Sequence, residues 1–260
     1  MSSTQYAYCF LSSVPMRAEA SDRSEMVNMI LFGEAFEIIE RKPKWIRIRL
    51  QHDQYEGWID PQQSRPLSLE SFEKLCRAPK FFAQSSEEKL VTLNGSSFTI
   101  TKGACFPNVK QRVFKIGNDT FTYYGELHKS KKDRATLKES AMDYLGTPYY
   151  WGGRSTLGID CSGFIQMIFR MNGIFLPRDA SQQAKKGKSL SFLEECNLGD
   201  LAFFDNAEGD IVHVGMILED YKVIHASGRV RIDTLDHSGI YNHETGKHTH
   251  KLRVLKSILD

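Results

Sequence analysis

The chain has 260 residues, of which 41% are hydrophobic and 25% charged, an ordinary composition for a globular protein with a buried core. Its 34 basic and 32 acidic residues are interspersed and leave a formal charge of +2, which argues against a nucleic-acid partner. No segment approaches the ~20 consecutive apolar residues that a membrane-spanning helix needs, so we expect no membrane partner.

The cysteines and the first residues bear on the cellular compartment. Five scattered cysteines contain no C-x-x-C pair, which argues against a disulfide framework or a zinc knuckle and predicts free thiols: Cys9, Cys76, Cys105, Cys161 and Cys196. The N-terminal stretch lacks the basic and then apolar segments of a signal peptide. If Met1 is the native start, we expect a cytoplasmic protein; if a leader has been removed, we expect a periplasmic or secreted one.

The first part of the chain consists of short β-rich runs separated by turn-forming and charged segments. The expected strands are Tyr6–Leu11, Met26–Leu31, Ala35–Arg41, Trp45–Leu50 and Glu56–Ile59. Short strands at this spacing predict a small barrel. The pattern resembles the bacterial SH3-like domain, chiefly in its L-F-G-E and G-W-I elements, and we assign this domain to residues 1–64. The alternative is a cell-wall-binding or purely structural module.

A second β-rich block follows a short helix expected at Leu69–Cys76. A weak internal repeat relates residues 33–39 to residues 95–101. We therefore predict a second, degenerate SH3-like β-barrel with a leading helix over residues 65–128. The basic run His128–Arg134 is interpreted as a solvated linker.

The third predicted domain, residues 129–260, is organised around Cys161. A glycine-rich loop precedes this cysteine, and the apolar run Phe164–Met171 predicts a buried helix after it. Cys161 therefore lies in the first helical turn, where unpaired N–H groups and the helix dipole favour a thiolate and lower the pKa from ~8.5. This position suits a nucleophile whose own backbone N–H stabilises an oxyanion, although a buried structural thiol is the alternative.

Two histidines follow on a predicted hairpin, with strands His213–Leu218 and Lys222–Ala226. With the turn centred on Asp220 or one residue before it, His213 and His225 face the same side of the sheet. Cys161, His213 and His225 then fit nucleophile, base and orienting residue.

The same residues allow a weaker metal hypothesis. Cys161, His213 and His225 could supply three zinc ligands, but without a second cysteine or a carboxylate as a further ligand a zinc site is the weaker interpretation. His243, His248 and His250 form a second candidate cluster, which we interpret as exposed loop residues between two terminal strands. We therefore expect neither a metal nor a cofactor.

The successive motifs GTPYYWGG, DCSGF, LPRDASQQA, LGDLAFF, HVGMIL and VIHASG resemble those of the NlpC-type cysteine peptidases. The resemblance covers residues 135–260 and implies an α+β protein: a papain-like, circularly permuted peptidase domain preceded by two small SH3-like β-barrels. It also implies catalysis by Cys161, His213 and His225. The two preceding barrels are similar to those of the γ-D-glutamyl-L-diamino acid endopeptidases. The implied partner is L-Ala-γ-D-Glu-diamino acid, cleaved through a thioester acyl-enzyme by what we expect to be a monomer.

Asp160 bears on substrate choice. As a helix N-cap it satisfies first-turn N–H groups, but a carboxylate beside Cys161 opposes formation of a thiolate. We therefore expect a substrate ammonium to neutralise Asp160, and hence a preference for peptides with a free amino group. By resemblance, Tyr55 and Glu25 of the first barrel close this end of the site.

Further candidate substrate contacts come from the matching motifs. Tyr149 and Trp151 are expected to wall the cleft, Ser162 to contact the substrate, and Arg178 and Asp179 to meet its D-glutamyl or diamino acid groups. The alternatives are aromatic core packing for the first two and a surface ion pair for the last two. Two other functions remain open at this stage, a non-catalytic cell-wall-binding protein and an acyl or amide transferase on the same fold.

Overall fold

A computed structural model describes residues 5–85, 88–92 and 94–259. Met1, on which the expected compartment depends, lies outside the described residues. The chain divides into two compact units, one formed by residues 1–128 with 154–156 and the other by residues 129–153 with 157–260. None of the described helices is long and apolar enough to cross a membrane.

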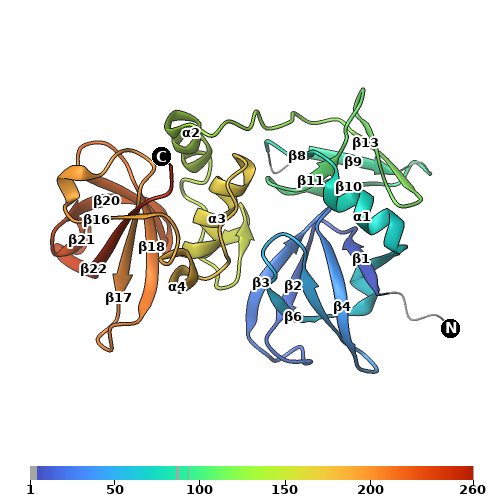
Figure 1. The fold of residues 1–260 in the computed structure, drawn as a ribbon, viewed down its shortest axis with the longest axis horizontal. Helices are drawn as coiled ribbons and strands as arrows, with labels where there is room; N and C mark the ends of the chain where they lie inside the picture. The colour runs from blue at the N-terminus through green and yellow to red at the C-terminus, as the bar shows by residue number, and fades with distance from the viewer. Residues whose placement is uncertain (1–4, 86–87, 93, 260) are drawn as a thin grey trace. The chain divides into compact units, whose positions relative to one another are not determined.

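The first unit is built mainly from short strands (Figure 1). Its elements are β1 (Tyr6–Cys9), β2 (Ser13–Arg17), β3 (Met26–Leu31), β4 (Ala35–Arg41), β5 (Ile46–Leu50), β6 (Glu56–Ile59), a 3-10 turn (Pro61–Gln63), β7 (Ser64–Leu67), α1 (Leu69–Arg77), β8 (Lys80–Phe82), β9 (Glu88–Thr92), β10 (Ser97–Ile100), β11 (Cys105–Pro107), β12 (Val113–Ile116) and β13 (Asp119–Tyr123). The five strands expected in the first block and the helix after it are confirmed, whereas β2 was not anticipated from the sequence.

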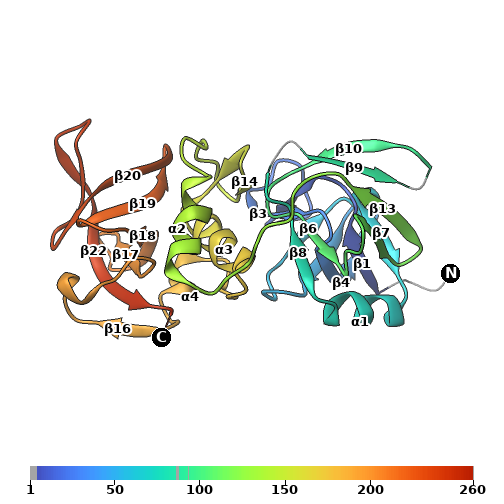
Figure 2. The same cartoon turned by 90° about the horizontal axis from the view of Figure 1, so that it is seen from above.

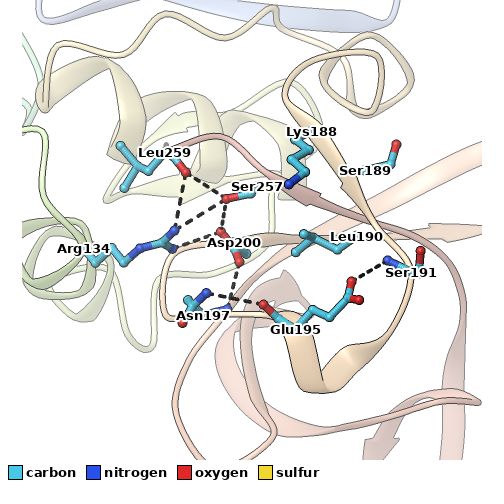
Figure 3. Close-up of a pocket in the computed structure, with 10 residues that line it drawn as sticks. All are labelled: Arg134, Lys188, Ser189, Leu190, Ser191, Glu195, Asn197, Asp200, Ser257 and Leu259. Atoms are coloured by element: carbon cyan, nitrogen blue, oxygen red, sulfur yellow. Dashed lines mark hydrogen bonds and ion pairs between the residues drawn. The ribbon is translucent and has the colours of Figure 1, made fainter.

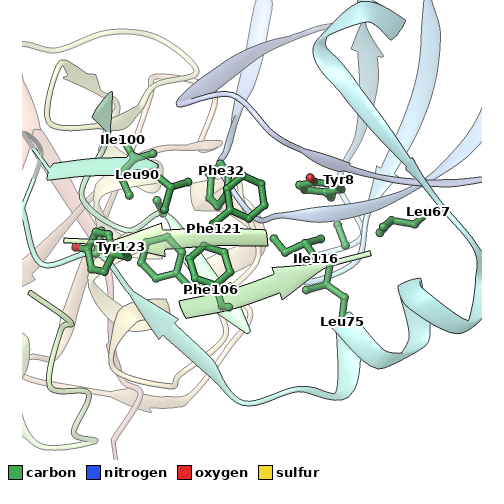
Figure 4. Close-up of a cluster of buried hydrophobic side chains, with 14 residues drawn as sticks. Tyr8, Phe32, Leu67, Leu75, Leu90, Ile100, Phe106, Ile116, Phe121 and Tyr123 are labelled. Carbon is green, nitrogen blue, oxygen red and sulfur yellow. The ribbon is translucent and has the colours of Figure 1, made fainter. Parts of the chain in front are cut away.

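The strands of the first unit form two larger sheets and a separate pair. One sheet has the order β3-β2-β6-β5-β4-β1-β7, the other has the order β10-β9-β13-β12, and β11 pairs with β8. Both larger sheets contribute to one aromatic core, in which Phe32 lies 5.2 Å from Phe121 between ring centroids (Figure 4). Because β7 joins the first sheet and the core is shared, the division into two barrels at residue 64 stays a prediction.

Close backbone approach inside the first unit requires glycine in the L-F-G-E element. Gly33 has a φ of +84°, and a Cβ atom there would lie 1.8 Å from the carbonyl oxygen of Cys105. The next residue, Glu34, is buried and forms an ion pair of 3.0 Å with Arg154, which is grouped with this unit. This sequence element is therefore determined by packing.

The second unit places three helices on one side of an antiparallel sheet (Figures 1 and 2). Its elements are α2 (Arg134–Met142), β15 (Gly158–Ile159), α3 (Cys161–Met171), α4 (Ala180–Gln183), β16 (Lys188–Leu190), a 3-10 turn (Leu193–Glu195), β17 (Leu201–Asp205), β18 (Ile211–Ile217), β19 (Lys222–Ser227), β20 (Arg229–Asp236), β21 (Gly239–Asn242) and β22 (Lys247–Ser257), while β14 (Arg154–Ser155) is grouped with the first unit. The sheet order is β16-β22-β17-β18-β19-β20-β21, with an additional pairing of β22 with β21.

Helix α3 is enclosed by the core of the second unit, and its buried residues include the polar Ser162, Gln166 and Arg170. Every residue of this helix is buried, because α3 packs on β18 and β19 on one side and on α2 on another. A helix enclosed on several sides carries apolar residues beyond a single face, as the run Phe164–Met171 largely does. The buried helix fixes the location of its first residue, Cys161, against the sheet.

Candidate active site

Helix α3 begins at Cys161, as expected from the sequence. Asp160 is its N-cap, and the Asp160 carboxylate accepts a hydrogen bond of 2.6 Å from the backbone N–H of Gly163. The first N–H groups of a helix have no intrahelical partner, so they remain available to the side chain of Cys161 and to a bound group. Cys161 is only 5% exposed.

The electrostatics of the thiol differ from the expectation. Burial, and next the carboxylate of Asp160, raise the pKa of the Cys161 thiol to about 12, although the backbone N–H groups of Val214 and Ser162 lower it. The predicted lowering of the pKa by the helix terminus was therefore wrong for the free protein. The pKa is raised because burial removes the solvation of the thiolate, and the helix terminus stabilises the thiolate by less than that loss.

The hydrogen bond from Val214 also places the sulfur in the fold. Val214 directly follows His213 on β18, so the Cys161 sulfur lies against the strand that carries the expected base. The thiol and the base therefore come from two elements, α3 and β18, that are packed together in one unit.

The two expected catalytic histidines lie on adjacent strands. In the register of β18 and β19, Gly215 is opposite His225, so His213 is a diagonal neighbour of His225 on the same face. The distance from His213 Nε2 to His225 Nδ1 is 2.8 Å. The predicted hairpin, centred on Asp220, and the shared face are therefore confirmed.

Asp233 adds a third residue to this pair of histidines, and the sequence analysis did not identify it. It lies on β20, is 4% exposed, and its Oδ2 is 3.0 Å from His225 Nε2. Although burial raises it, hydrogen bonds from His225 and Arg231 hold the pKa of Asp233 below its usual range. The sequence could have indicated Asp233 only as a carboxylate at an inward-facing position of a strand. Its position next to His225 follows only once β20 is known to pair with β19.

The Asp233 carboxylate determines the tautomers of both rings. A carboxylate accepts, so His225 Nε2 carries the proton and His225 Nδ1 is left as an acceptor. His213 Nε2 must then donate to His225 Nδ1, which leaves the lone pair on His213 Nδ1. Among the described residues no hydrogen bond to His213 Nδ1 is found, so this nitrogen can accept a proton.

His250 also belongs to this group, contrary to its interpretation as an exposed loop residue. It lies on β22, and its ring stacks on that of His213 with 4.1 Å between centroids. Burial, and next the neighbouring His225, lower the pKa of His250 to about 4, while burial, His250 and His225 together hold the pKa of His213 well below 6.5. His213 is therefore a neutral imidazole at neutral pH. His243 and His248 are exposed, as expected, but His248 lies on β22 and not in a loop.

The expected role of a substrate ammonium in neutralising Asp160 needs correction. Arg178 already lies against this carboxylate, with 3.0 Å from Arg178 Nη1 to Asp160 Oδ1, and it is 2% exposed. Two N–H groups, those of Gly152 and Gly163, occupy further lone pairs of Asp160. The carboxylate is thus saturated by the protein, and the surface ion pair considered for Arg178 and Asp179 is replaced by a buried pair of Arg178 with Asp160.

The other candidate contacts of the second unit differ in exposure. Tyr149 is half-buried, and burial followed by the charges of Cys161 and Asp160 raises the pKa of its hydroxyl. Its hydroxyl is therefore within electrostatic reach of the thiol. Trp151 is 57% exposed, which excludes core packing. Ser162 Oγ accepts a hydrogen bond of 2.9 Å from Arg178, and Asp179 is partly buried at the start of α4.

Tyr55 and Glu25 belong to the first unit. The backbone N–H of Tyr55 bonds to Asp53 Oδ1 at 3.0 Å, and the carbonyl of Glu25 accepts from the N–H of Ala18 at 2.9 Å. Their expected contribution to the site stays a prediction.

A cavity of about 640 Å³ lies elsewhere in the second unit (Figure 3). Its polar groups bond to one another, with 2.9 Å from Arg134 Nη1 to Asp200 Oδ1 and 2.7 Å from Ser257 Oγ to the same oxygen. Arg134 also donates to the carbonyl of Leu198 at 2.6 Å. This network ties α2 to the sheet and pairs the charges of Arg134 and Asp200.

A thiol at the start of a buried helix, packed on a sheet that carries an imidazole with an oriented partner, defines a papain-like cysteine peptidase. The family comparison agrees with this class. Residues 146–249 match the NlpC/P60 family, and residues 16–63 match the bacterial dipeptidyl-peptidase SH3 domain. The chain belongs to the NlpC/P60 family.

Curated relatives span most of the chain. The γ-D-glutamyl-L-lysine dipeptidyl-peptidase of Bacillus subtilis is 29% identical over 212 residues, which are 76% of this chain and 71% of the relative. Dipeptidyl-peptidase 6 of Lysinibacillus sphaericus is 28% identical over 250 residues, 84% of this chain and 88% of the relative. A probable endopeptidase of Haemophilus influenzae is 39% identical over 119 residues, 45% of this chain and 73% of the relative.

Solved structures show the same fold. An NlpC/P60 family protein from Bacillus cereus has a TM-score of 0.80 at 18% identity, covering 98% of this chain and 100% of its own. An NlpC/P60 endopeptidase from Photobacterium damselae has a TM-score of 0.74 at 15% identity, and the match covers 98% of this chain and 72% of that protein. The expected fold class, a papain-like peptidase domain preceded by SH3-like β-structure, is confirmed.

Proposed function

We propose that this protein is a cysteine endopeptidase that hydrolyses the γ-D-glutamyl–diamino acid bond of peptidoglycan-derived peptides with a free N-terminal L-Ala. The observation that carries the proposal is the chain of contacts from His213 through His225 to Asp233, beside the Cys161 thiol. Two of the relatives are named for the γ-D-glutamyl-L-lysine bond and for release of a dipeptide.

Both reacting groups are neutral before the reaction begins. The Cys161 thiol keeps its proton because its pKa is about 12, and His213 is unprotonated because its pKa is well below 6.5. Proton transfer from the sulfur to His213 Nδ1 therefore accompanies attack of the sulfur on the γ-carbonyl carbon, without an ion pair stored beforehand.

The remaining steps use the same groups. The first-turn N–H groups of α3 stabilise the oxyanion of the tetrahedral intermediate. The His213 imidazolium, held by His225, returns its proton to the amine of the departing diamino acid, and a thioester remains on Cys161. Water, deprotonated by His213, then cleaves the thioester and releases L-Ala-D-Glu.

The preference for a free amine forms part of the proposal. The saturated Asp160 carboxylate can meet an ammonium only by sharing lone pairs with its present partners, so the recognition we propose also involves Tyr55 and Glu25. Support comes from the matched dipeptidyl-peptidase SH3 segment, which includes both residues. An enzyme that releases the dipeptide L-Ala-D-Glu requires L-Ala to be the first residue of the substrate, and the amino group of L-Ala is then free.

The decisive experiment uses L-Ala-γ-D-Glu-diaminopimelate and its lysine counterpart, each free and N-acetylated. Mass spectrometry should show L-Ala-D-Glu only from the free peptides and none with Cys161→Ala. Cleavage of the acetylated peptides at an equal rate would reject the amine preference alone. Absence of cleavage of every peptide would reject the peptidase, and formation of a new amide with an added amine in preference to hydrolysis would indicate a transferase.

A further inference from the structure

Three imidazoles converge on one face of the sheet in the second unit. Each of His213, His225 and His250 offers one ring nitrogen, and these three atoms lie within 4.8 Å of one another. The residues come from β18, β19 and β22, so the group is created by the fold. We propose that this cluster is a reversible inhibitory site for a divalent transition-metal ion of the zinc type.

The ring nitrogens of His225 and His250 on the far side of the cluster bond to polar groups, as in metal sites. His225 Nε2 bonds to the Asp233 carboxylate at 3.0 Å, which directs His225 Nδ1 into the cluster. His250 Nδ1 is 2.8 Å from Thr249 Oγ1, which leaves His250 Nε2 for the ion. Histidine ligands typically engage a carboxylate or another polar group through the second nitrogen, which fixes the ring.

The ligand atoms, which lie within 4.8 Å of one another, must shift by at most about 1.5 Å to reach the spacing of a zinc site. Zinc binds imidazole nitrogen at about 2.0–2.1 Å in tetrahedral geometry, which places two such nitrogens about 3.3 Å apart. The His213 and His225 nitrogens, now 2.8 Å apart, must separate by about half an ångström to admit the ion. His250 is partly exposed, so its ring has room to close and the ion has a route of entry.

Imidazole ligands determine the class of ion. Neutral imidazole suits zinc, copper, nickel and cobalt, whereas magnesium and calcium prefer oxygen ligands. Water completes the coordination, and the Cys161 sulfur is not needed for the three-nitrogen site.

Binding of the ion and catalysis exclude each other. The ion takes the lone pair of His213 Nε2, and the proton of that ring moves to Nδ1, so the ring stays neutral. His213 Nδ1 then no longer offers the lone pair that removes the thiol proton. The hydrogen bond that orients His213 through His225 is lost in the same event.

Inhibition is tested in the full chain at buffered free Zn²⁺, with each variant compared with its own metal-free rate. In His250→Phe, which keeps an aromatic ring over His213, half-inhibition should require at least about tenfold more Zn²⁺, because loss of even an outer-shell partner costs about that much in metal affinity. His248→Phe is the matched control, because His248 lies exposed on the same strand outside the cluster, and its zinc response should equal that of the parent. Equal inhibition of parent and His250→Phe would overturn the proposal.

A second measurement does not depend on the proposed function or on the thiol. Co²⁺ is titrated into full-length Cys161→Ala and into Cys161→Ala with His250→Phe, while circular dichroism verifies folding of both. Visible absorption of a nitrogen-ligated tetrahedral cobalt site should form in the first and be lost in the second. Absence of binding to Cys161→Ala would overturn the three-imidazole site and attribute any zinc inhibition to the thiol.

Discussion

The Asp233 carboxylate holds the His225 ring on the side opposite to His213, with 3.0 Å between Asp233 Oδ2 and His225 Nε2. Asp233→Asn should lower kcat on the order of 10²-fold, with a smaller change in KM, because the amide can donate to His225 and reverse both tautomers. Asp236→Asn on the same strand is the control, because Asp236 contacts His248 instead. If kcat of Asp233→Asn and its fall at acidic pH were both unchanged, His225 would need no carboxylate.

The raised pKa of the thiol predicts how Cys161 reacts with iodoacetamide. Since the pKa is about 12, the thiolate fraction, and with it the alkylation rate, should rise about tenfold per pH unit from neutral to alkaline pH without a plateau. Mass spectrometry of the peptide containing Cys161 separates this reaction from alkylation of the other four cysteines. A plateau at neutral pH would reveal a preformed thiolate.

The same measurement separates the influence of Asp160 from that of burial. Asp160→Asn removes the carboxylate that is the second largest cause of the raised thiol pKa, and it leaves Arg178 as an uncompensated positive charge nearby. Alkylation of Cys161 at a given pH should therefore be faster than in the parent. Asparagine can still cap the helix through its Oδ1, so a slower reaction would show that the Asp160 charge does not oppose formation of the thiolate.

The buried pair of Arg178 and Asp160 should dominate the stability of this region. Arg178→Met leaves the Asp160 charge buried without its partner and should cost about 3–5 kcal/mol in the free energy of unfolding, measured with urea. Adding Asp160→Asn should recover part of that loss, because no unpaired charge then remains. Additive losses in the double variant would contradict a direct coupling.

Gly215 permits the approach of β18 and β19 beside the catalytic pair. A Cβ atom at this position would lie 2.5 Å from Val223 Cγ2 and 3.0 Å from His225 Cβ. Gly215→Ala should destabilise the protein by about 1–3 kcal/mol and lower kcat through displacement of His225. Adding Val223→Ala should restore stability in part; failure to do so would locate the strain at His225.

The features that the sequence predicted correctly depend on neighbouring residues. An apolar run after a glycine-rich loop determines helix α3 and the position of Cys161. The turn near Asp220 and Tyr221, whose φ angles are 55° and 54°, determines the register that joins His213 to His225. Both patterns act over a short stretch of chain, so composition and periodicity suffice to recognise them.

The features that were missed depend on distant strands. His250 reaches His213 because β22 lies next to β17 and β17 next to β18, and no pattern along the chain encodes that order. Asp233 reaches His225 only through the pairing of β20 with β19. The thiol pKa was misjudged for a related reason, because burial of Cys161 depends on the assembled core.

The hairpin that joins the two imidazoles limits how the chain can change length. One residue inserted into either strand between His213 and the turn, or between the turn and His225, would rotate one ring to the opposite face of the sheet. The stretch from Cys161 to His213 includes surface loops, where an inserted residue does not change the face on which either side chain lies. The first interval can therefore vary in length in its loops, while the number of residues between the two histidines is fixed by the sheet.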